Sequence, residues 1–420
     1  MARTLTPLDA YSLMNSLVRQ ATGQTSLAVT DTSSFISAGE TILSTGRENV
    51  LNSLSMVLGR TFAAVRPYNA KLAMINAIDT GAYTSRFRKI SYYAEDALPS
   101  GWFNTDVSTN FADSYTSGDN GGVSTKSQWE QHPAMPLEQV FGGSSTWQDC
   151  LTVYQAKLEA AFRSEDEFNI FIQGILTEHG NAIESQKEAF NRMTLLSAMA
   201  TRYYLESNSI TTNCAINMTT AFNTEMNTTY TTLQLQTVYI KEFLEFMVAK
   251  VKEISDRMTE RGTHFHDPLT KTVGGTTYSI LRHTPYDRQR IILYGPLLRK
   301  AESMVLPEIF RPGYLDIDRQ FEKVEFWQTN TTDADRPKIN INSAYYDSVS
   351  GEQKATGAVS LDYVIGFIYD ADALLVDYKL ETTHTSGLEA RKGYSNTWLT
   401  FSKNAISDQT ENACLLYMAD

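Results

Sequence analysis

Two long stretches of this chain carry the period of an amphipathic helix. The clearest ends before Gly262, a residue that favours helix termination, and places seven apolar residues at helical spacing on one face: Ile240, Phe243, Leu244, Met247, Val251, Ile254 and Met258. The second starts at a capping box in residues 164–167 and runs to Tyr204. Gly174 and Gly180 lie inside it and are expected to weaken or break the helix.

A long polar stretch separates two strand-like segments in the first third of the chain. Residues 83–93 alternate large and polar side chains, and residues 129–141 form a second strand-like piece. Between them, residues 94–128 are rich in turn-forming residues. A loop of this length is uncommon inside a compact domain unless it is functional or disordered. The loop is therefore disordered, functional or ordered by another molecule, and if a neighbouring copy orders it the protein is an assembly subunit.

Basic and aromatic side chains of this hairpin are the candidate contact residues. The basic group alternates along the first strand and could face acidic groups of a neighbouring subunit or DNA, but a solvated strand face explains it equally well. Aromatic residues in a polar loop commonly mark a contact surface, and the alternative is that they fold back on the base of the loop. The candidate inter-subunit contacts are Arg86, Arg88, Lys89, Trp102, Phe103, Phe111, Tyr115 and Trp129.

The first 79 residues are interpreted as an extended arm. Short helices are expected over residues 9–19 and 48–64, with a loop over residues 23–45 between them. An arm of this kind becomes ordered when it docks on another surface.

The last third mixes short elements without regular alternation, which indicates an α+β fold. Residues 297–305 have a helical pattern, and residues 329–357 are interpreted as a polar loop. The expected strands are residues 290–294, 324–328, 361–370, 394–401 and an apolar terminal strand at 413–418.

Composition narrows the class of protein. The 420 residues are 42% hydrophobic and 20% charged, which is typical of a globular protein with two or three domains or subdomains. A net charge of −12 argues against a general nucleic-acid binder. Residues 1–90 nevertheless contain nine basic and five acidic residues, so one basic and one acidic face are possible, although ordinary scatter would give the same count. We expect neither a signal peptide nor a membrane span.

Motifs for catalysis are not found in the sequence. His264, His266 and Asp267 are the only grouping that resembles a metal site, and their context favours a solvated loop instead. Cys150 is expected to open a helix, where a thiolate could be stabilised, but a small buried cysteine is the simpler interpretation. Cys214 and Cys414 are isolated, which indicates a reducing compartment. We expect no enzyme activity and no catalytic residue, cofactor or metal.

The order of these parts resembles the major capsid proteins of tailed bacteriophages, which have the Hong Kong 97-type fold, and podophage and crAss-like relatives in particular. Three segments carry the resemblance. They are residues 129–137 with sequence WEQHPAMPL, the helical run that ends at Tyr203 and Tyr204, and residues 394–404 with sequence YSNTWLTFSKN. The resemblance covers most of the chain as a pattern of parts and not as a strict motif.

The resemblance implies a domain order. It places an N-terminal arm at 1–79, an extended hairpin loop (E-loop) at 80–143, a long spine helix with part of a peripheral domain at 144–230, an axial domain at 231–322, and axial and peripheral strands with the C-terminal strand at 323–420.

The function implied is that of a major capsid protein, which self-assembles into an icosahedral shell around a double-stranded DNA genome. Its partners would be other copies of itself in hexamers and pentamers, packaged DNA held weakly, and portal, scaffolding and decoration proteins, with no membrane. It would be assembled in the host bacterial cytoplasm and reside in the virion capsid. A portal or tail subunit, an encapsulin-like shell protein and an enzyme with a lid are the alternatives.

Overall fold

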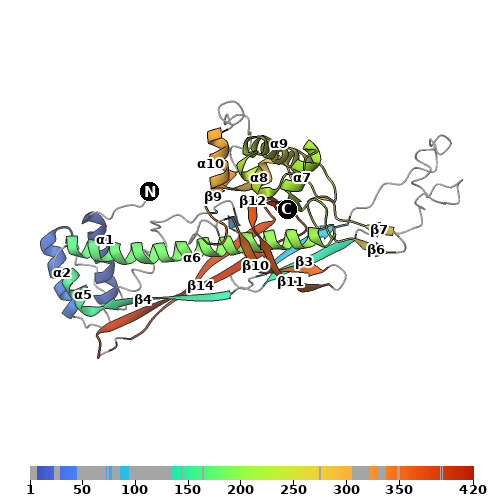
Figure 1. The fold of residues 1–420 in the computed structure, drawn as a ribbon. Coiled ribbons are helices and arrows are strands. Elements are labelled where there is room, and N and C mark those ends of the chain that lie inside the picture. The colour runs from blue at the N-terminus through green and yellow to red at the C-terminus, as the bar shows by residue number, and fades with distance from the viewer. Residues whose placement is uncertain are drawn as a thin grey trace.

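The computed structural model combines helices and strands in one α+β arrangement (Figure 1). The residues it describes are 7–22, 29–44, 72, 75–77, 86–93, 135–142, 145–162, 165–273, 276–304, 321–329, 337–347, 351–387, 389 and 391–420. No helix in these ranges is long and apolar enough to cross a membrane.

The longest element is α6 (Glu165–Ser207), a 43-residue helix that runs along most of the molecule (Figure 1). It is unbroken at Gly174 and Gly180, so the expectation of a break is wrong. A glycine costs about 1 kcal/mol in a helix interior. Each half of α6 packs against a separate hydrophobic core, and that packing outweighs the local cost.

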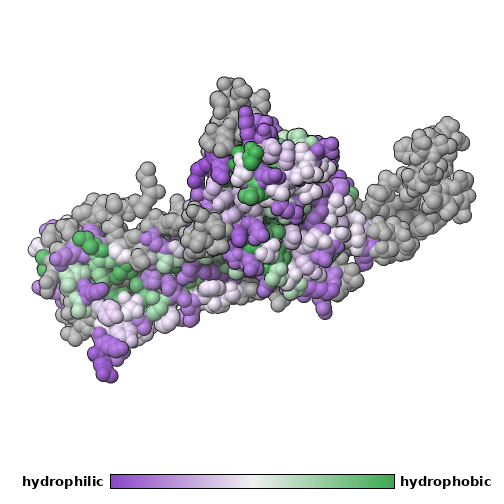
Figure 2. All heavy atoms as spheres, viewed as in Figure 1, coloured by the Kyte–Doolittle hydropathy of each residue, from purple (hydrophilic) through white to green (hydrophobic). Residues whose placement is uncertain are grey.

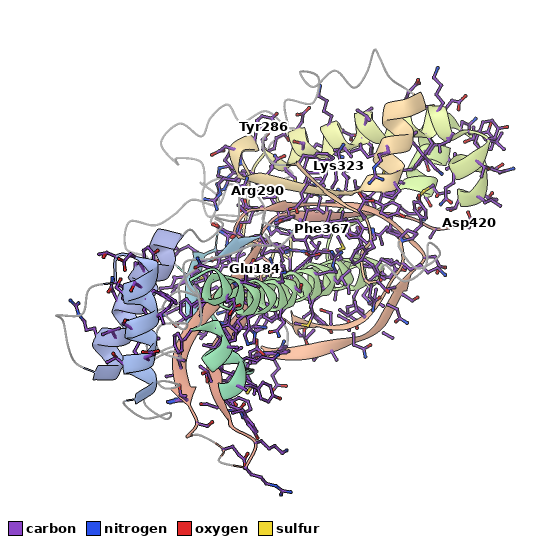
Figure 3. All side chains as sticks on the ribbon, turned by 90° about the vertical axis from the view of Figure 1, so that its left-hand side faces the viewer. Glu184, Tyr286, Arg290, Lys323, Phe367 and Asp420 are labelled. Atoms are coloured by element: carbon purple, nitrogen blue, oxygen red, sulfur yellow. The ribbon has the colours of Figure 1, made fainter. Side chains whose placement is uncertain are left out.

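The main core surrounds a mixed five-stranded sheet. The strands, in spatial order, are β5 (Ala215–Asn217), β15 (Ala413–Met418), β12 (Tyr363–Asp370), β8 (Gln289–Tyr294) and β9 (Phe321–Val324). The central strand β12 is an almost continuous run of buried residues, because it is covered on both faces. In Figure 3, Phe367 of this strand lies between α6 and the opposite helical layer. The strands predicted at 290–294, 361–370 and 413–418 are confirmed.

Four helices cover the face of this sheet opposite to α6 (Figure 1). They are α7 (Met218–Met226), α8 (Thr232–Thr237), α9 (Ile240–Met258) and α10 (Gly295–Met304). The predicted apolar face of α9 is confirmed, since every one of its seven predicted positions is buried. The strand predicted at 324–328 is wrong beyond Val324, where the chain turns so that Trp327 enters the core.

A second sheet lies along α6. Its order is β1 (Asn76–Ala77), β13 (Leu374–Thr385), β14 (Tyr394–Ser407) and β4 (Ser145–Tyr154). Cys150 pairs with Trp398 inside β4, so the expectation that Cys150 opens a helix is wrong. The Ser145–Tyr154 segment has only one fully buried residue, so its exposed alternation gave a weak strand signal.

A smaller core joins the first helices to the start of α6. It contains side chains of α1 (Pro7–Thr22), α2 (Thr32–Ser44), α5 (Gln155–Ala161), β4 and α6. The loop predicted at 23–45 is wrong over α2, which Asp31 begins by accepting a hydrogen bond of 2.7 Å from the Ser34 amide. These helices therefore pack on their own chain, and Figure 2 shows apolar side chains gathered at that end. The helix predicted at 48–64 lies outside the described residues.

Three hairpins complete the fold. They are β2 (Arg86–Tyr92) with β3 (Pro136–Gly142), β6 (Lys271–Val273) with β7 (Thr276–Tyr278), and β10 (Ile339–Asp347) with β11 (Glu352–Leu361). The polar loop predicted at 329–357 is wrong where β10 and β11 lie. Two of its polar residues, Ser343 and Thr356, are buried, and the Thr356 hydroxyl accepts a hydrogen bond of 3.1 Å from the Ser343 amide.

An ion pair links α6 to β4 and predicts a pH effect on stability. His179 Nδ1 lies 3.2 Å from Asp149 Oδ2, and the hydrogen bond to His179 holds the pKa of Asp149 below its ordinary value. An aspartate whose pKa is lowered by folding stabilises the folded state at pH values above its ordinary pKa. This contribution is lost as the pH falls through the lowered pKa of the folded state. Asp149→Asn should therefore lower the free energy of unfolding near neutral pH, and by less in acid, where Asp149 is protonated in the wild type. The cost near neutral pH should be only about 1 kcal/mol, because the pair is partly exposed.

Thermal unfolding followed against pH measures this difference. Asp362→Asn is the matched control, because the Asp362 side chain is 88% exposed and lies 3.7 Å from its lysine partner. A cost of Asp149→Asn that stays constant from neutral to acidic pH would contradict the assignment.

Candidate assembly surface

The β2–β3 hairpin has two chemically different faces. Its strands pair antiparallel, with Phe87 opposite Phe141 and Lys89 opposite Gln139. Side chains at alternate positions of a strand point to opposite sides. Phe87, Lys89 and Ser91 therefore point toward the body, and the residues between them point outward.

The outward face is partly apolar. Ile90, Tyr92 and Val140 have exposed fractions of 49%, 61% and 56%. Beside them Arg88 Nη2 donates a hydrogen bond of 2.9 Å to Glu138 Oε2 on the neighbouring strand. Exposed apolar side chains next to polar ones are typical of a protein contact surface.

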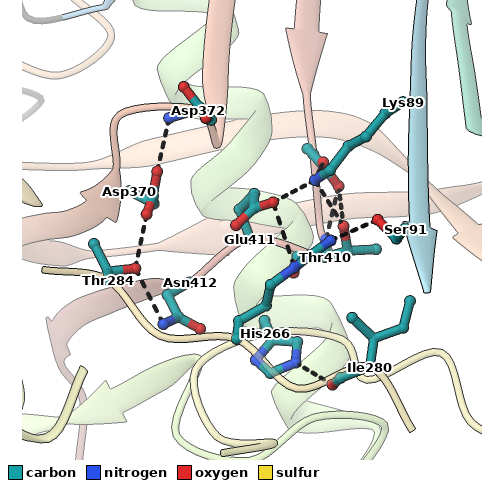
Figure 4. Close-up of polar contacts among 12 residues, drawn as sticks. Lys89, Ser91, His266, Ile280, Thr284, Asp370, Asp372, Thr410, Glu411 and Asn412 are labelled. Atoms are coloured by element: carbon teal, nitrogen blue, oxygen red, sulfur yellow. Dashed lines mark hydrogen bonds and ion pairs between the residues drawn. The ribbon is translucent and has the colours of Figure 1, made fainter. Parts of the chain in front are cut away.

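The inward face is fixed to the body by a charged contact (Figure 4). Lys89 Nζ makes ion pairs with Asp408 and Glu411, and it donates to Thr410 Oγ1 at 3.2 Å. All three partners lie in the turn between β14 and β15. The Asp408 side chain is only 2% exposed and that of Lys89 is 17% exposed, so solvent screens this contact weakly.

A guanidinium of α6 holds that turn in place. Arg202 donates hydrogen bonds to the main-chain oxygens of Gln409 at 2.6 Å, of Asp408 at 2.8 Å and of Glu411 at 2.8 Å. The Asp408 carboxylate also accepts hydrogen bonds of 2.8 Å from the amide and the hydroxyl of Thr410. The two carboxylates are thus presented to Lys89 by a rigid turn.

A second arginine connects the turn to the hairpin. Arg282 Nη2 donates to Ser91 Oγ at 2.7 Å, and Arg282 Nε lies 3.4 Å from Glu411 Oε1. Burial raises the pKa of Glu411, and the charges of Lys89 and Arg282 oppose that increase without cancelling it. Ionised Glu411 therefore depends on both cations.

His266 and Asp267 are buried and His264 is exposed, so the expectation of a solvated loop is wrong from His266 on. His266 is completely buried, and its Nε2 lies 2.8 Å from the Ile280 carbonyl oxygen (Figure 4). The Asp267 carboxylate accepts a hydrogen bond of 2.5 Å from the Gln409 amide group. Burial lowers the pKa of His266 and raises that of Asp267. Asp267 therefore binds the 408–411 turn through the side chain of Gln409.

Metal chemistry has no support in the described ranges. These residues contain no group of three or more His, Cys, Asp or Glu side chains that could hold a metal ion. Cys214 and Cys414 are fully buried, and burial raises the pKa of the Cys214 thiol to about 11. A thiol in that state is a poor nucleophile.

Three of the eight predicted contact residues lie in the described part of the chain, and the side chains of Arg88 and Lys89 lie in different places. Arg86 belongs to β2, Arg88 pairs within the hairpin, and Lys89 points to the body. The remaining candidates lie outside the described residues: Trp102, Phe103, Phe111, Tyr115 and Trp129.

Sequence reasoning missed residues of two kinds. The outward residues Ile90, Tyr92 and Val140 could have been found from the alternation of the two strands. Arg202 and Glu411 carried no local signal, because their partners are distant in the sequence.

Comparison with solved structures identifies the fold. A chain in the capsid structure of Staphylococcus phage Andhra matches with a TM-score of 0.52 and 9% identity, covering 84% of this chain and 85% of that one. The chain has a phage capsid fold. A chain in the structure of the head fiber and inner core protein gp22 of bacteriophage P68 gives a TM-score of 0.49 at 10% identity, covering 84% and 85%. One from Mycobacterium phage Cain gives 0.39 at 10% identity, covering 86% and 93%.

The assignment depends on the Andhra match, which covers most of both chains. No family model matches the sequence, and a search of curated proteins finds no similar one. At 9% identity the likeness concerns the course of the backbone and not individual side chains. The surface chemistry of this chain must therefore be argued from its own residues.

Proposed function

We propose that the protein is the major capsid subunit of a tailed phage, whose copies self-assemble into an icosahedral shell around double-stranded DNA. The observation that carries this proposal is a phage capsid fold combined with a hairpin that has an exposed, partly apolar outer face. Many such contacts, each of modest strength, become cooperative when a symmetric shell closes.

The proposed arrangement follows the parts of the chain. Residues 80–143 would be the extended hairpin loop, and residues 144–230 the spine helix with part of the peripheral domain. Residues 231–322 would be the axial domain, and residues 323–420 the axial and peripheral strands with the C-terminal strand. Within the proposed arm at 1–79, α1 and α2 pack on α6 of their own chain, so docking on a neighbour would concern the rest of the arm. The net charge of −12 would keep adhesion to packaged DNA weak.

Further partners and location belong to the same proposal. Portal, scaffolding and decoration proteins would bind the shell, assembly would occur in the host bacterial cytoplasm, and the product would reside in the virion. The proposed role is structural and not enzymatic.

Electron microscopy of the purified full chain tests the proposal. Shells alone, or shells formed with a co-expressed scaffolding protein, are the expected result. Rings would indicate a portal or tail subunit, and particles that remain monomeric under all these conditions would contradict a shell subunit. Shells filled with a host cargo protein instead of DNA would indicate an encapsulin-like compartment.

One substitution on the hairpin tests its outer face. Ile90→Asp should reduce shell yield by about tenfold or more, because it places a charge in a contact that many copies repeat. The side chain points away from the body, so the chain should still fold. Ile90→Val is the matched control and should assemble normally, with folding of both variants checked by circular dichroism. Normal shells from Ile90→Asp would exclude this face from the assembly contacts.

A further inference from the structure

We propose that Lys89, Asp408 and Glu411 form an ionic latch that fixes the angle of the β2–β3 hairpin on the body and opens when its carboxylates are protonated. The latch would let the hairpin swing as a unit while the rest of the fold stays intact. This inference goes beyond the proposed function and does not depend on shell formation.

The first argument is that the hairpin is attached by polar contacts. None of its described residues belongs to either hydrophobic core. Among the described residues, its polar side-chain contacts to the body are those of Lys89, the hydrogen bond from Arg282 to Ser91, and a long hydrogen bond of 3.5 Å between Thr410 and Gln139. Electrostatic contacts respond to pH and salt, whereas apolar packing responds little to either.

The second argument is that the hairpin has room to move. A pocket of about 800 Å³ that is partly open to solvent lies between β3, α6 and β10, with Phe141, Met193 and Tyr345 in its walls. Elements that are closely packed leave few voids larger than a water molecule. A space of this size beside β3 means that the hairpin is not closely packed against α6 there.

The charges around the latch come from four segments. Lys89 on β2 and Arg282 before η2 (Tyr286–Arg288) supply two cations, and Asp408 and Glu411 of the turn supply two carboxylates. Arg202 of α6 is committed to the main-chain oxygens of the turn. Lys89 and Arg282 match the two carboxylates in charge when both are ionised. Protonation of Glu411 leaves Arg282 without a charged partner and Lys89 with Asp408 alone.

The pH response has a defined direction. Because burial raises its pKa, Glu411 takes up a proton at a higher pH than an exposed glutamate does. A neutral carboxyl group makes a hydrogen bond only about half as strong as the charged one. Lys89 lowers the pKa of Glu411 while the hairpin is closed, so the pKa of the buried Glu411 rises further when the hairpin carries Lys89 away. Protonation of Glu411 therefore favours the open hairpin, and acid loosens the latch.

Distance measurements between two spin labels test the latch on the unassembled chain. One label is placed on the hairpin through Tyr92→Cys and one on α8 through Leu233→Cys, since these side chains are 61% and 68% exposed. Cys150 is replaced by Ser, and Cys214 and Cys414 are buried and should stay unlabelled.

Lys89→Met should at least double the width of the distance distribution at neutral pH, and lowering the pH to about 5 should broaden the wild-type distribution similarly. Arg88→Met is the matched control, because Arg88 pairs with Glu138 inside the hairpin and should leave the width unchanged. A narrow distribution for Lys89→Met, or an equal broadening for Arg88→Met, would overturn the proposal.

Glu411→Gln provides a second test if Lys89→Met does not fold. This variant keeps the shape of the side chain, and its distribution should already be broad at neutral pH and change little in acid. A wild-type response to pH in Glu411→Gln would also overturn the proposal. Because no step requires a shell, failure of this test is distinct from failure of the proposed function.

Discussion

Arg202→Met is expected to lower the free energy of unfolding by about 3–5 kcal/mol. The side chain is 3% exposed, and its guanidinium serves three main-chain oxygens of the 408–411 turn. Methionine fills most of the same space but donates no hydrogen bond. The buried oxygens that lose their donor would each cost about 1–3 kcal/mol.

Chemical denaturation followed by circular dichroism measures this loss. Arg257→Met on α9 is the matched control, because Arg257 is exposed and pairs with Glu253 within the same helix. That control should change stability by less than about 0.5 kcal/mol. Equal effects of the two substitutions would show that the hydrogen bonds of Arg202 do not support the turn.

Trp327→Ala is expected to cost about 3–5 kcal/mol in the main core. Trp327 is 1% exposed and is the largest fully buried side chain among the described residues. Its Nε1 donates a hydrogen bond of 2.9 Å to the carbonyl oxygen of Val364, the second residue of β12. Removing the ring therefore opens a cavity and also leaves that oxygen without its donor.

A comparison with Trp327→Phe separates the two contributions. Phenylalanine keeps most of the apolar contact and loses the hydrogen bond, so its cost should be about half or less of that of alanine. Both variants are measured by urea unfolding under identical conditions. A cost below about 1 kcal/mol for Trp327→Ala would mean that the core closes around the gap.

The sequence predicted the strands of the hairpin but not the partners of Lys89. The sequence predicted the two strands of the hairpin at residues 83–93 and 129–141, and the structure pairs β2 with β3 inside these ranges, to within one residue. The sequence made Lys89 a candidate for contact with a neighbouring subunit or DNA and left a solvated strand face open, and the structure pairs Lys89 with Asp408 and Glu411 of its own chain. Alternation divides a strand into two faces and does not say which face meets the body.

The sequence by itself determined the elements whose signal is local. The buried stripe of α9 and the apolar strands β12 and β15 depend on periodicity within a few residues, and each was found near its observed bounds. Only the tertiary structure decided the rest. α6 stays continuous through two glycines because separate cores hold its halves, and β4 forms because β14 pairs with it. Arg202 lies more than two hundred residues before the carbonyl groups it binds, and no local pattern can record a contact over that separation.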